Sequence, residues 1–280
     1  VNTYNYLRKR GIIESRHGKG FFVAREIELR AKRVFLLFDA MNSYKEILYK
    51  SFTSSLGEGY VVDIFFHYYN LRQFRRFIDN NIGDYNYYVV LPHFNLDVSE
   101  ILGKIPEQQL ILMDKDVPAL KNYPGIFQDF ENDVIHALSE ANHLIKKYNK
   151  LFLVVGSDFQ FIPQGIIDGF TAICQRDQFE YQLLKEINPK HIRSGEAYLV
   201  FTDNDLITIA QHAKANALEL GKDIGLISYD DTPLKSVLAN GITTITTDFV
   251  YMGQMAAKMI KEKIQGKFKN PSNIIIRNSL

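Results

Sequence analysis

The sequence contains a single cysteine, Cys174, and no apolar run long enough to cross a membrane. One thiol excludes an internal disulfide and suits a reducing compartment, so we expect a cytoplasmic protein. Because a membrane-spanning helix needs about 18 or more consecutive apolar residues, we expect no membrane partner. Cys174 stands in the segment FTAICQRD, which predicts a buried helix face, with a catalytic thiol as the alternative.

Motifs of catalysis and cofactor binding are also missing. The chain has no GxGxxG or GxxxxGK loop to cradle phosphates, no HExxH motif, and no set of cysteines and histidines at metal-ligand spacing. Its seven histidines are scattered along the sequence. We therefore expect a protein that is not an enzyme and that holds no metal and no cofactor.

Charge is distributed unevenly along the chain. Residues 1–33 hold nine Lys and Arg against three Glu, whereas the whole chain of 280 residues has a net charge of only +1. The remainder is therefore mildly acidic. A basic N-terminal segment followed by an acidic body indicates that only the segment meets a polyanion such as DNA.

From residue 32 onward, short apolar runs alternate with amphipathic helical stretches, which is typical of an α/β fold with parallel sheets. The predicted strands are 34–38, 61–66, 87–91, 110–113, 151–155, 198–201, 224–228 and 242–246. The predicted helices are 44–57, 71–80, 131–148, 164–177, 205–220 and 252–265. The units form two similar lobes that separate near residues 128–132, and no flexible linker intervenes.

Polar and aromatic side chains follow the predicted strands. Ligands of open parallel sheets bind beyond the carboxyl ends of the strands, so these side chains are candidates to line a cleft. Carboxylates and amides can bind the hydroxyls of a polyhydroxylated ligand while flat rings cover its C–H faces. The alternative is that such residues only cap helices and make turns. The candidates include Asp39, Asn42, Tyr44, His67, His93, Asp114, Asp116, Asp158, Phe159, Asp203, Asn204, Asp230, Asp231, Asp248 and Phe249.

The N-terminal segment predicts a helix over residues 1–10 that ends at Gly11, a strand over 11–14, a turn over 16–20 and a strand over 21–24. Arg16, His17 and Lys19 place positive charge in the turn, where a phosphate could bind. The residues alone leave open an ordinary surface hairpin with solvated charges.

This segment resembles the second half of the GntR-type winged helix, in which a recognition helix leads into a strand and a wing of the form R.G.GTFV. TYNYLRKRGII and SRHGKGFFV stand in those places. The resemblance implies that operator DNA is a partner, contacted by Thr3 and Asn5 and by the three basic residues of the turn. We expect the chain to begin inside the recognition helix, so that residues 1–30 are the C-terminal part of a truncated winged helix-turn-helix head and its linker.

The C-terminal half resembles the LacI-type effector domain. GKDIGLISYDDTPL and GITTITTDFVYMGQMAAKMI carry the YDDT turn and the MG..A helix of that family, and LILMDKDVP and TDNDLITIAQHA resemble two of its earlier segments. The resemblance implies a two-lobed, periplasmic-binding-protein-like domain over residues 31–280. Its first lobe would span about 31–129 and 247–266, and its second lobe about 130–246 and 267–280. Ile166 stands where many sugar-responsive members carry an arginine, so that ligand contact does not carry over.

The resemblance also implies roles for single residues. Asp230 would accept hydrogen bonds from ligand hydroxyls, Phe249 would cover an apolar ligand face, and Asp203 and Asn204 would contact the ligand from the second lobe. Each has a structural alternative: Asp230 or Asp231 could cap the next helix, Phe249 could be core, and His93 could be a solvated turn residue. The rest of the predicted ligand-binding set is Asn42, Tyr44, His93, Asp116 and Phe159.

The sequence therefore predicts a ligand-responsive transcription regulator, a repressor in the commoner case, that acts as a homodimer on a palindromic operator. Its effector would be a carbohydrate or a carbohydrate derivative. The main alternative is a sugar-binding protein or receptor with the same two lobes and no role on DNA. The basic N-terminal segment disfavours that alternative, because such a protein has no use for a wing.

Overall fold

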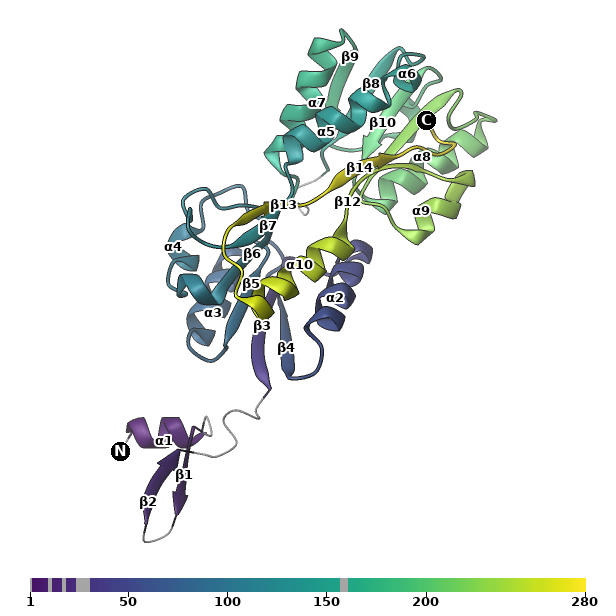
Figure 1. Ribbon diagram of the computed structural model, residues 1–280. Helices are drawn as coiled ribbons and strands as arrows, with labels where there is room; N and C mark the ends of the chain where they lie inside the picture. Colours follow the sequence, from purple (N-terminus) through teal and green to yellow (C-terminus); the bar gives the residue numbers. More distant parts are fainter. Residues whose placement is uncertain (1, 10–11, 17–18, 24–30, 157–160) are drawn as a thin grey trace.

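The computed structural model describes residues 2–9, 12–16, 19–23, 31–156 and 161–280. In the part of the chain from residue 31 onward, two six-stranded sheets form two lobes, each with helices on both faces of its sheet (Figure 1). The α/β class and the two lobes predicted from the sequence are therefore confirmed. No helix within the described ranges combines the length and the apolar character that a membrane crossing requires.

The sheet of the first lobe has the strand order β13-β7-β6-β5-β3-β4, and all of its pairs are parallel. Its elements are β3 (Lys32–Phe38), α2 (Ser43–Leu56), β4 (Tyr60–Phe66), α3 (Leu71–Asn81), β5 (Tyr87–Val90), α4 (Ser99–Leu102), a 3-10 turn (Glu107–Gln109), β6 (Leu110–Asp114), β7 (Gly125–Phe127), α10 (Phe249–Glu262) and β13 (Lys267–Lys269).

The second sheet has the order β14-β12-β11-β10-β8-β9, and only its edge pair β12–β14 is antiparallel. Its elements are α5 (Phe130–Glu140), α6 (Asn142–Ile145), β8 (Lys150–Val154), α7 (Gln164–Arg176), β9 (Glu180–Leu184), a 3-10 turn (Pro189–His191), β10 (Glu196–Val200), α8 (Asp203–Ala215), β11 (Ile224–Tyr229), α9 (Pro233–Val237), a 3-10 turn (Leu238–Asn240), β12 (Thr243–Thr247) and β14 (Ser272–Ile275).

Most strands of these sheets are parallel and buried, which explains why apolar runs in the sequence predicted them. β5, β6 and the last five residues of β3 are buried or nearly so, because helices cover both faces. α2 and α10 pack on one face of the first sheet, where Gly253 is required: a Cβ there would lie 2.8 Å from the Leu48 carbonyl oxygen and 2.8 Å from the Phe52 nitrogen. The predicted burial of Cys174 is also confirmed, since it lies on α7 against the second sheet.

Two boundaries differ from the sequence prediction. The single helix expected over 131–148 is divided into α5 and α6, because the backbone leaves the helical path at Ala141. The second lobe was expected to resume at about residue 267, but Lys267–Lys269 pairs with β7 and so belongs to the first sheet. The chain therefore returns to the second lobe only after Lys269.

The N-terminal segment forms α1 (Asn2–Lys9) and an antiparallel hairpin of β1 (Ile13–Arg16) and β2 (Gly20–Val23). The order of elements agrees with the prediction, but the first strand starts later than expected because the Ile12 N–H still bonds to the Leu7 carbonyl at the end of α1, at 2.9 Å. The ring of Tyr4 stacks on Phe21 at 4.8 Å and joins the helix to the hairpin.

Candidate functional site

A cavity of about 300 Å³ lies between the two lobes, at the carboxyl ends of β3, β4, β10 and β11. Four of the predicted ligand-binding residues line it, namely Asn42, Tyr44, Asp203 and Asp230. Larger hollows of about 490 and 520 Å³ occur on the outer surface of the second lobe and at the amino ends of the first-lobe strands, and one of about 540 Å³ lies between the lobes beside Asp116 and Phe130. Among the hollows of the described residues, the cavity of about 300 Å³ has residues at or directly after strand ends of both sheets in its lining. It is therefore the candidate site, and we call it the inter-lobe cavity. Its other lining residues are Ala40, Ser43, Tyr69, Phe201, Thr202, Tyr229, Thr232 and Lys235.

Asp230 lines this cavity and carries an unpaired carboxylate oxygen. Its backbone lies in the left-handed region, with φ +63°, and its N–H is held by the Ile245 carbonyl at 2.8 Å. Oδ1 is buried and has no hydrogen-bond partner among the described residues. Burial raises the pKa of the Asp230 carboxyl to about 7. A buried acceptor without a partner is costly, so this oxygen is prepared for a donor from a ligand.

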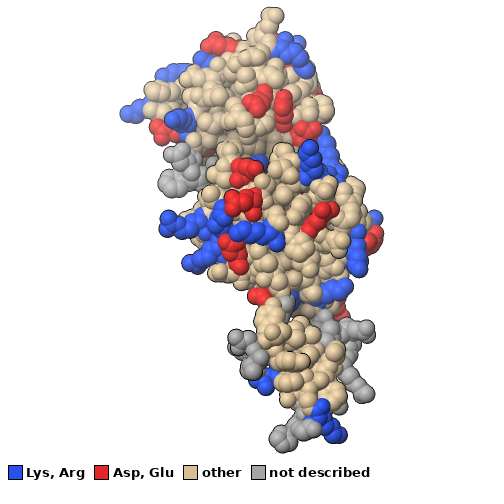
Figure 2. All heavy atoms as spheres, turned by 90° about the vertical axis from the view of Figure 1, so that its left-hand side faces the viewer, with Lys and Arg blue, Asp and Glu red and all other residues tan. Residues whose placement is uncertain are grey.

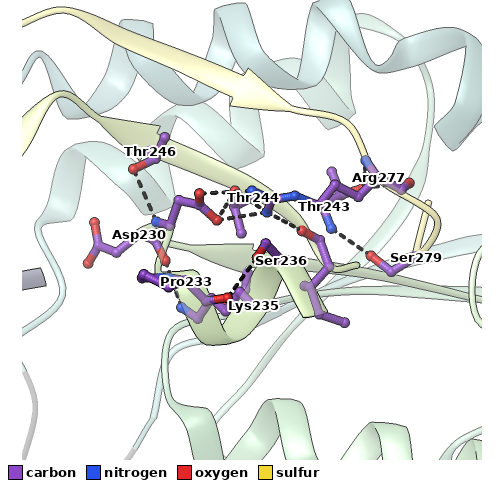
Figure 3. A network of polar contacts seen from close by, with 12 residues as sticks. Asp230, Pro233, Lys235, Ser236, Thr243, Thr244, Thr246, Arg277 and Ser279 are labelled. Atoms are coloured by element: carbon purple, nitrogen blue, oxygen red, sulfur yellow. Dashed lines mark hydrogen bonds and ion pairs between the residues drawn. The ribbon is translucent and has the colours of Figure 1, made fainter. Parts of the chain in front are cut away.

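The neighbouring carboxylate, Asp231, is fully engaged. Its two oxygens accept hydrogen bonds from Arg277 at 2.7 and 2.9 Å, and Oδ1 also accepts one from the Thr244 hydroxyl at 3.0 Å. Burial raises the pKa of Asp231, but the hydrogen bonds from Arg277 and Thr244 more than offset this and lower it overall. Figure 3 shows the Asp230 carboxylate pointing away from this network. Neither aspartate caps α9, whose N-cap residue is Thr232.

Lys235, on α9, is a buried lysine that the sequence did not single out. Its ammonium donates a hydrogen bond to the Tyr229 carbonyl at 2.8 Å. It donates another to the Asp230 carbonyl at 2.7 Å (Figure 3). Asp203 Oδ1 lies 4.0 Å from the same ammonium. Burial lowers the pKa of Lys235. The lysine thereby fixes the left-handed turn that presents the Asp230 carboxylate.

A chain of buried charges lies beneath the first-lobe side of the cleft. Asp39 binds the Lys45 ammonium through Oδ1 and His93 Nδ1 through Oδ2, the latter at 3.0 Å. His93 Nε2 lies 2.9 Å from Asp114 Oδ2, and Gln128 donates a hydrogen bond to Asp114 Oδ1. These groups lie at or after the carboxyl ends of β3, β5, β6 and β7, so the strand ends bring together residues from four separate segments.

The environment of His93 favours its protonated form. Burial lowers its pKa, but the Asp39 and Asp114 carboxylates more than offset this and raise the pKa to about 9. Because the side chain is only 5% exposed, His93 is not the solvated turn residue that the sequence left open. Both ring nitrogens face carboxylates, and no three acidic, histidine or cysteine side chains of the described segments are placed to hold a metal ion.

Tyr44 and Phe249 form a stacked pair, with ring centroids 4.5 Å apart and planes at 24°. Tyr44 lines the cavity, whereas Phe249 is 4% exposed at the start of α10 and packs with the first-lobe core. Asn42 lines the cavity and also caps α2, because its side chain accepts a hydrogen bond from the Lys45 N–H at 3.1 Å. The structure thus places Phe249 behind the cavity wall, where it supports the Tyr44 ring.

The remaining predicted residues lie elsewhere. Asp116 forms an ion pair with Lys267 at 2.7 Å beside a separate hollow between the lobes, and Asn204 is exposed on α8 outside the cavity lining. Phe159 falls outside the described residues. In the N-terminal segment, Thr3, Asn5 and Lys19 are exposed, while His17 and the side chain of Arg16 lie outside what the structure describes.

Figure 2 shows acidic and basic side chains interspersed over the visible face of both lobes. This face therefore carries no extended area of one sign. The charge asymmetry noted in the sequence belongs to residues 1–33, which hold nine of the chain's 33 Lys and Arg.

Comparison with known proteins supports the two-lobed architecture. Residues 165–280 match the family described as periplasmic binding protein-like domain. No curated protein matches the chain by sequence.

Several solved structures share the fold at low sequence identity. The trehalose repressor from Escherichia coli is 14% identical with a TM-score of 0.73, covering 88% of this chain and 100% of that one. A periplasmic binding protein/LacI transcriptional regulator from Alkaliphilus metalliredigens, complexed with D-xylulofuranose, is 12% identical with a TM-score of 0.70, covering 89% and 98%. A lac repressor dimer bound to operator and the anti-inducer ONPF is 15% identical with a TM-score of 0.73, covering 92% and 86%. The chain therefore has a periplasmic-binding-protein-like α/β fold, shared with these transcription regulators.

Proposed function

We propose that the protein is a ligand-responsive, DNA-binding transcription regulator, and not an enzyme, that senses a sugar or sugar derivative in the inter-lobe cavity. The observation that carries this proposal is the buried, unpaired Oδ1 of Asp230 at that cavity. A ligand hydroxyl that donates to this carboxylate would recover the free energy lost on burying it. The rings of Tyr44 and Tyr229 line the same cavity and can cover the C–H faces of a sugar.

The N-terminal segment is proposed to serve as the recognition helix and wing of a GntR-type head on operator DNA. Its support is the helix followed by an antiparallel hairpin, together with the excess of basic residues over residues 1–33. Thr3 and Asn5 would contact DNA from α1, and Arg16, His17 and Lys19 from the turn. Positive side chains at phosphates supply affinity, and the helix supplies base contacts.

We infer that the protein acts as a homodimeric repressor on a palindromic operator. Two paired heads that bind two half-sites multiply the affinity, and the dimer fixes the spacing of the half-sites. A ligand that contacts both lobes favours their closed arrangement and thereby changes the placement of the heads. Coupling of this kind is typically worth about 1 to 3 kcal/mol. The solved structures that share the fold include a repressor dimer on its operator, which supports this assignment by analogy.

The second candidate is a sugar-binding protein without a role on DNA. The same cavity and the same two lobes would serve it equally well. The basic helix and hairpin before β3 favour the regulator, because a protein that only binds sugar gains nothing from them.

One experiment separates the two candidates. The full-length protein is used to select binding sites from a pool of random-sequence duplex DNA, and the selected duplex is then titrated with and without each sugar that raises the melting temperature. A ligand at 100 times its dissociation constant stabilises the folded protein by about 2.7 kcal/mol, which such a screen detects readily. We expect a palindromic site whose affinity changes with the sugar. Sugar binding with no selected site would favour the second candidate.

A further inference from the structure

We propose that the inter-lobe cavity selects an uncharged polyhydroxylated ligand of monosaccharide size and rejects its phosphorylated and carboxylated derivatives. This inference rests on the proposed effector function and narrows its ligand to one chemical class. It follows from the distribution of charge around the cavity, where the cations are already paired and one carboxylate is not.

Lys235 is the single lysine or arginine among the described residues that line the cavity. Two of its three N–H donors are used by the carbonyls of Tyr229 and Asp230. Its ammonium is also 4.0 Å from the Asp203 carboxylate, which offsets its charge. A phosphate needs several free donors and an unopposed positive charge, and Lys235 offers neither.

The next cations behind the wall are Lys45 and His93. Lys45 is paired with Asp39, and His93 lies between Asp39 and Asp114. Two cations face two carboxylates in this cluster, so its net charge is close to zero. Arg277, in the second lobe, is likewise engaged by both oxygens of Asp231. An anionic ligand would therefore gain no uncompensated attraction from any of these groups.

Among the described residues of the cavity, a hydrogen-bond acceptor, in contrast to the cations, still lacks a partner. Oδ1 of Asp230 is buried without a partner among the described residues, and Asp203 places a second, largely exposed carboxylate at the cavity. Hydroxyl groups supply the O–H donors that these oxygens require. A phosphate or carboxylate group supplies only acceptors and adds a like charge beside a buried carboxylate, which is strongly unfavourable.

The size and walls of the cavity agree with a single small ring. Its volume of about 300 Å³ is at the lower end of ligand sites. The rings of Tyr44, Tyr69 and Tyr229 line it, and Phe249 holds the Tyr44 ring in place from behind.

Isothermal titration calorimetry of the full-length protein at pH 8, where Asp230 is mostly ionised because its pKa is about 7, tests the inference. The probes are neutral aldopentoses and aldohexoses, each matched with its terminal phosphate ester and its uronic acid. We expect at least one neutral sugar to bind and its two anionic derivatives to bind about tenfold more weakly or worse, given a like charge at close range.

A variant pair assigns the rejection to Asp230. Asp230→Asn keeps the shape of the side chain and removes its charge, so the ratio of neutral to anionic affinity should fall about tenfold even if the neutral sugar itself binds more weakly. Asp79→Asn removes the same charge from the outer surface of the first lobe, where Asp79 pairs with Lys104, and should leave the ratio unchanged. Chemical unfolding of each variant confirms that it is folded.

The outcomes are distinct. An anionic derivative that binds as tightly as its parent sugar overturns the inference and leaves the proposed effector function standing. Binding by no sugar of either series overturns both. An unchanged ratio in folded Asp230→Asn overturns the assignment of selectivity to that carboxylate.

Discussion

The ring of Phe161, which precedes α7 in the second lobe, stacks on the imidazole of His93 in the first lobe, with centroids 5.2 Å apart and planes at 16°. The Lys115 ammonium, also in the first lobe, lies 5.1 Å from the centre of the same ring. Although burial lowers the pKa of His93, its two carboxylate partners raise it to about 9, so the imidazole is a cation at neutral pH. The ring of one lobe therefore contacts two positive groups of the other.

Removing this ring should weaken the closed arrangement of the lobes. A cation–π contact is worth about 0.5 to 2 kcal/mol, so Phe161→Ala should lower the affinity for the effector about 2- to 30-fold. Phe161→Tyr keeps the π face and should retain most of the affinity. Calorimetric titration of both variants with the sugar that binds wild type checks this, and wild-type affinity in the alanine variant would show that the ring does not matter for closure.

His93 should make stability fall with pH in the alkaline range. Its pKa in the folded protein is about 9, above the ordinary 6.5, because Asp39 and Asp114 outweigh the opposing effect of burial. The stabilisation is therefore fully present below pH 6.5 and is lost as the pH rises through 9, with a size on the order of 3 kcal/mol. His93→Gln removes this titration. Urea unfolding at pH 6, 7.5 and 9 should show the gap between wild type and variant shrinking, and a constant gap would contradict the assignment.

Asp230 and Asp231 should respond to alanine substitution in opposite ways. Asp230→Ala should abolish or greatly weaken effector binding with little loss of stability, since Oδ1 has no partner among the described residues. Asp231→Ala should cost about 2 kcal/mol or more, because it leaves the half-buried Arg277 without its carboxylate. Calorimetry and urea unfolding of both variants decide the matter, and equal losses of stability would refute the division of roles.

The sequence predicted the sheets better than their edges. Buried strands such as β5 and β6 read as continuous apolar runs because helices cover both of their faces. β9 was missed because it is an edge strand with the polar sequence EYQLL and several exposed residues. The sequence did not predict β7 and β13, because each has only three residues and is recognised as a strand only by its pairing with a neighbouring strand.

The candidate site was predicted in part for a similar reason. Strand-end position, together with the resemblance to the LacI-type effector domain, predicted Asn42, Tyr44, Asp203 and Asp230 among a larger set of candidates, and these four line the cavity. Lys45 and Lys235 could not be predicted, because a lysine is buried only where tertiary structure supplies partners such as Asp39 or backbone carbonyls. The resemblance singled out Asp230 in the YDDT segment, but only the position of Arg277 shows that Asp231 is held in an ion pair.

The turn of the N-terminal hairpin should contribute to DNA affinity through charge. Replacing Arg16 and Lys19 by alanine in the full-length protein should weaken operator binding for all sequences alike. The slope of log affinity against log salt should fall by about 0.9 for each phosphate that the variant no longer neutralises. Fluorescence anisotropy at several salt concentrations measures both quantities. An unchanged affinity and slope would contradict the proposal that this hairpin is a DNA-binding wing. As a control, the double substitution Lys104→Ala and Lys222→Ala on the lobes should leave both quantities unchanged.

Phe249 should couple the cavity to the rest of the protein through Tyr44. Its ring is buried at the start of α10 and stacks on Tyr44, which lines the cavity. Phe249→Ala should therefore destabilise the protein by about 3 to 5 kcal/mol, as expected for a buried aromatic. It should also lower effector affinity, because the Tyr44 ring loses its support. Phe249→Leu keeps most of the buried volume but removes the aromatic stacking on Tyr44. A loss of effector affinity in this variant is therefore due to the lost stacking and not to reduced stability.

The decisive measurement on Phe249 is the effect of the effector on DNA affinity. α10 begins directly after β12, so Phe249 stands where the chain passes from the second lobe to the first. A ligand against Tyr44 should thus favour one arrangement of the lobes through this pair, and Phe249→Leu should reduce the effector-induced change in operator affinity at saturating ligand. If that change keeps its wild-type size at saturation while stability falls, Phe249 is a core residue only, and the coupling between cavity and DNA runs through other residues.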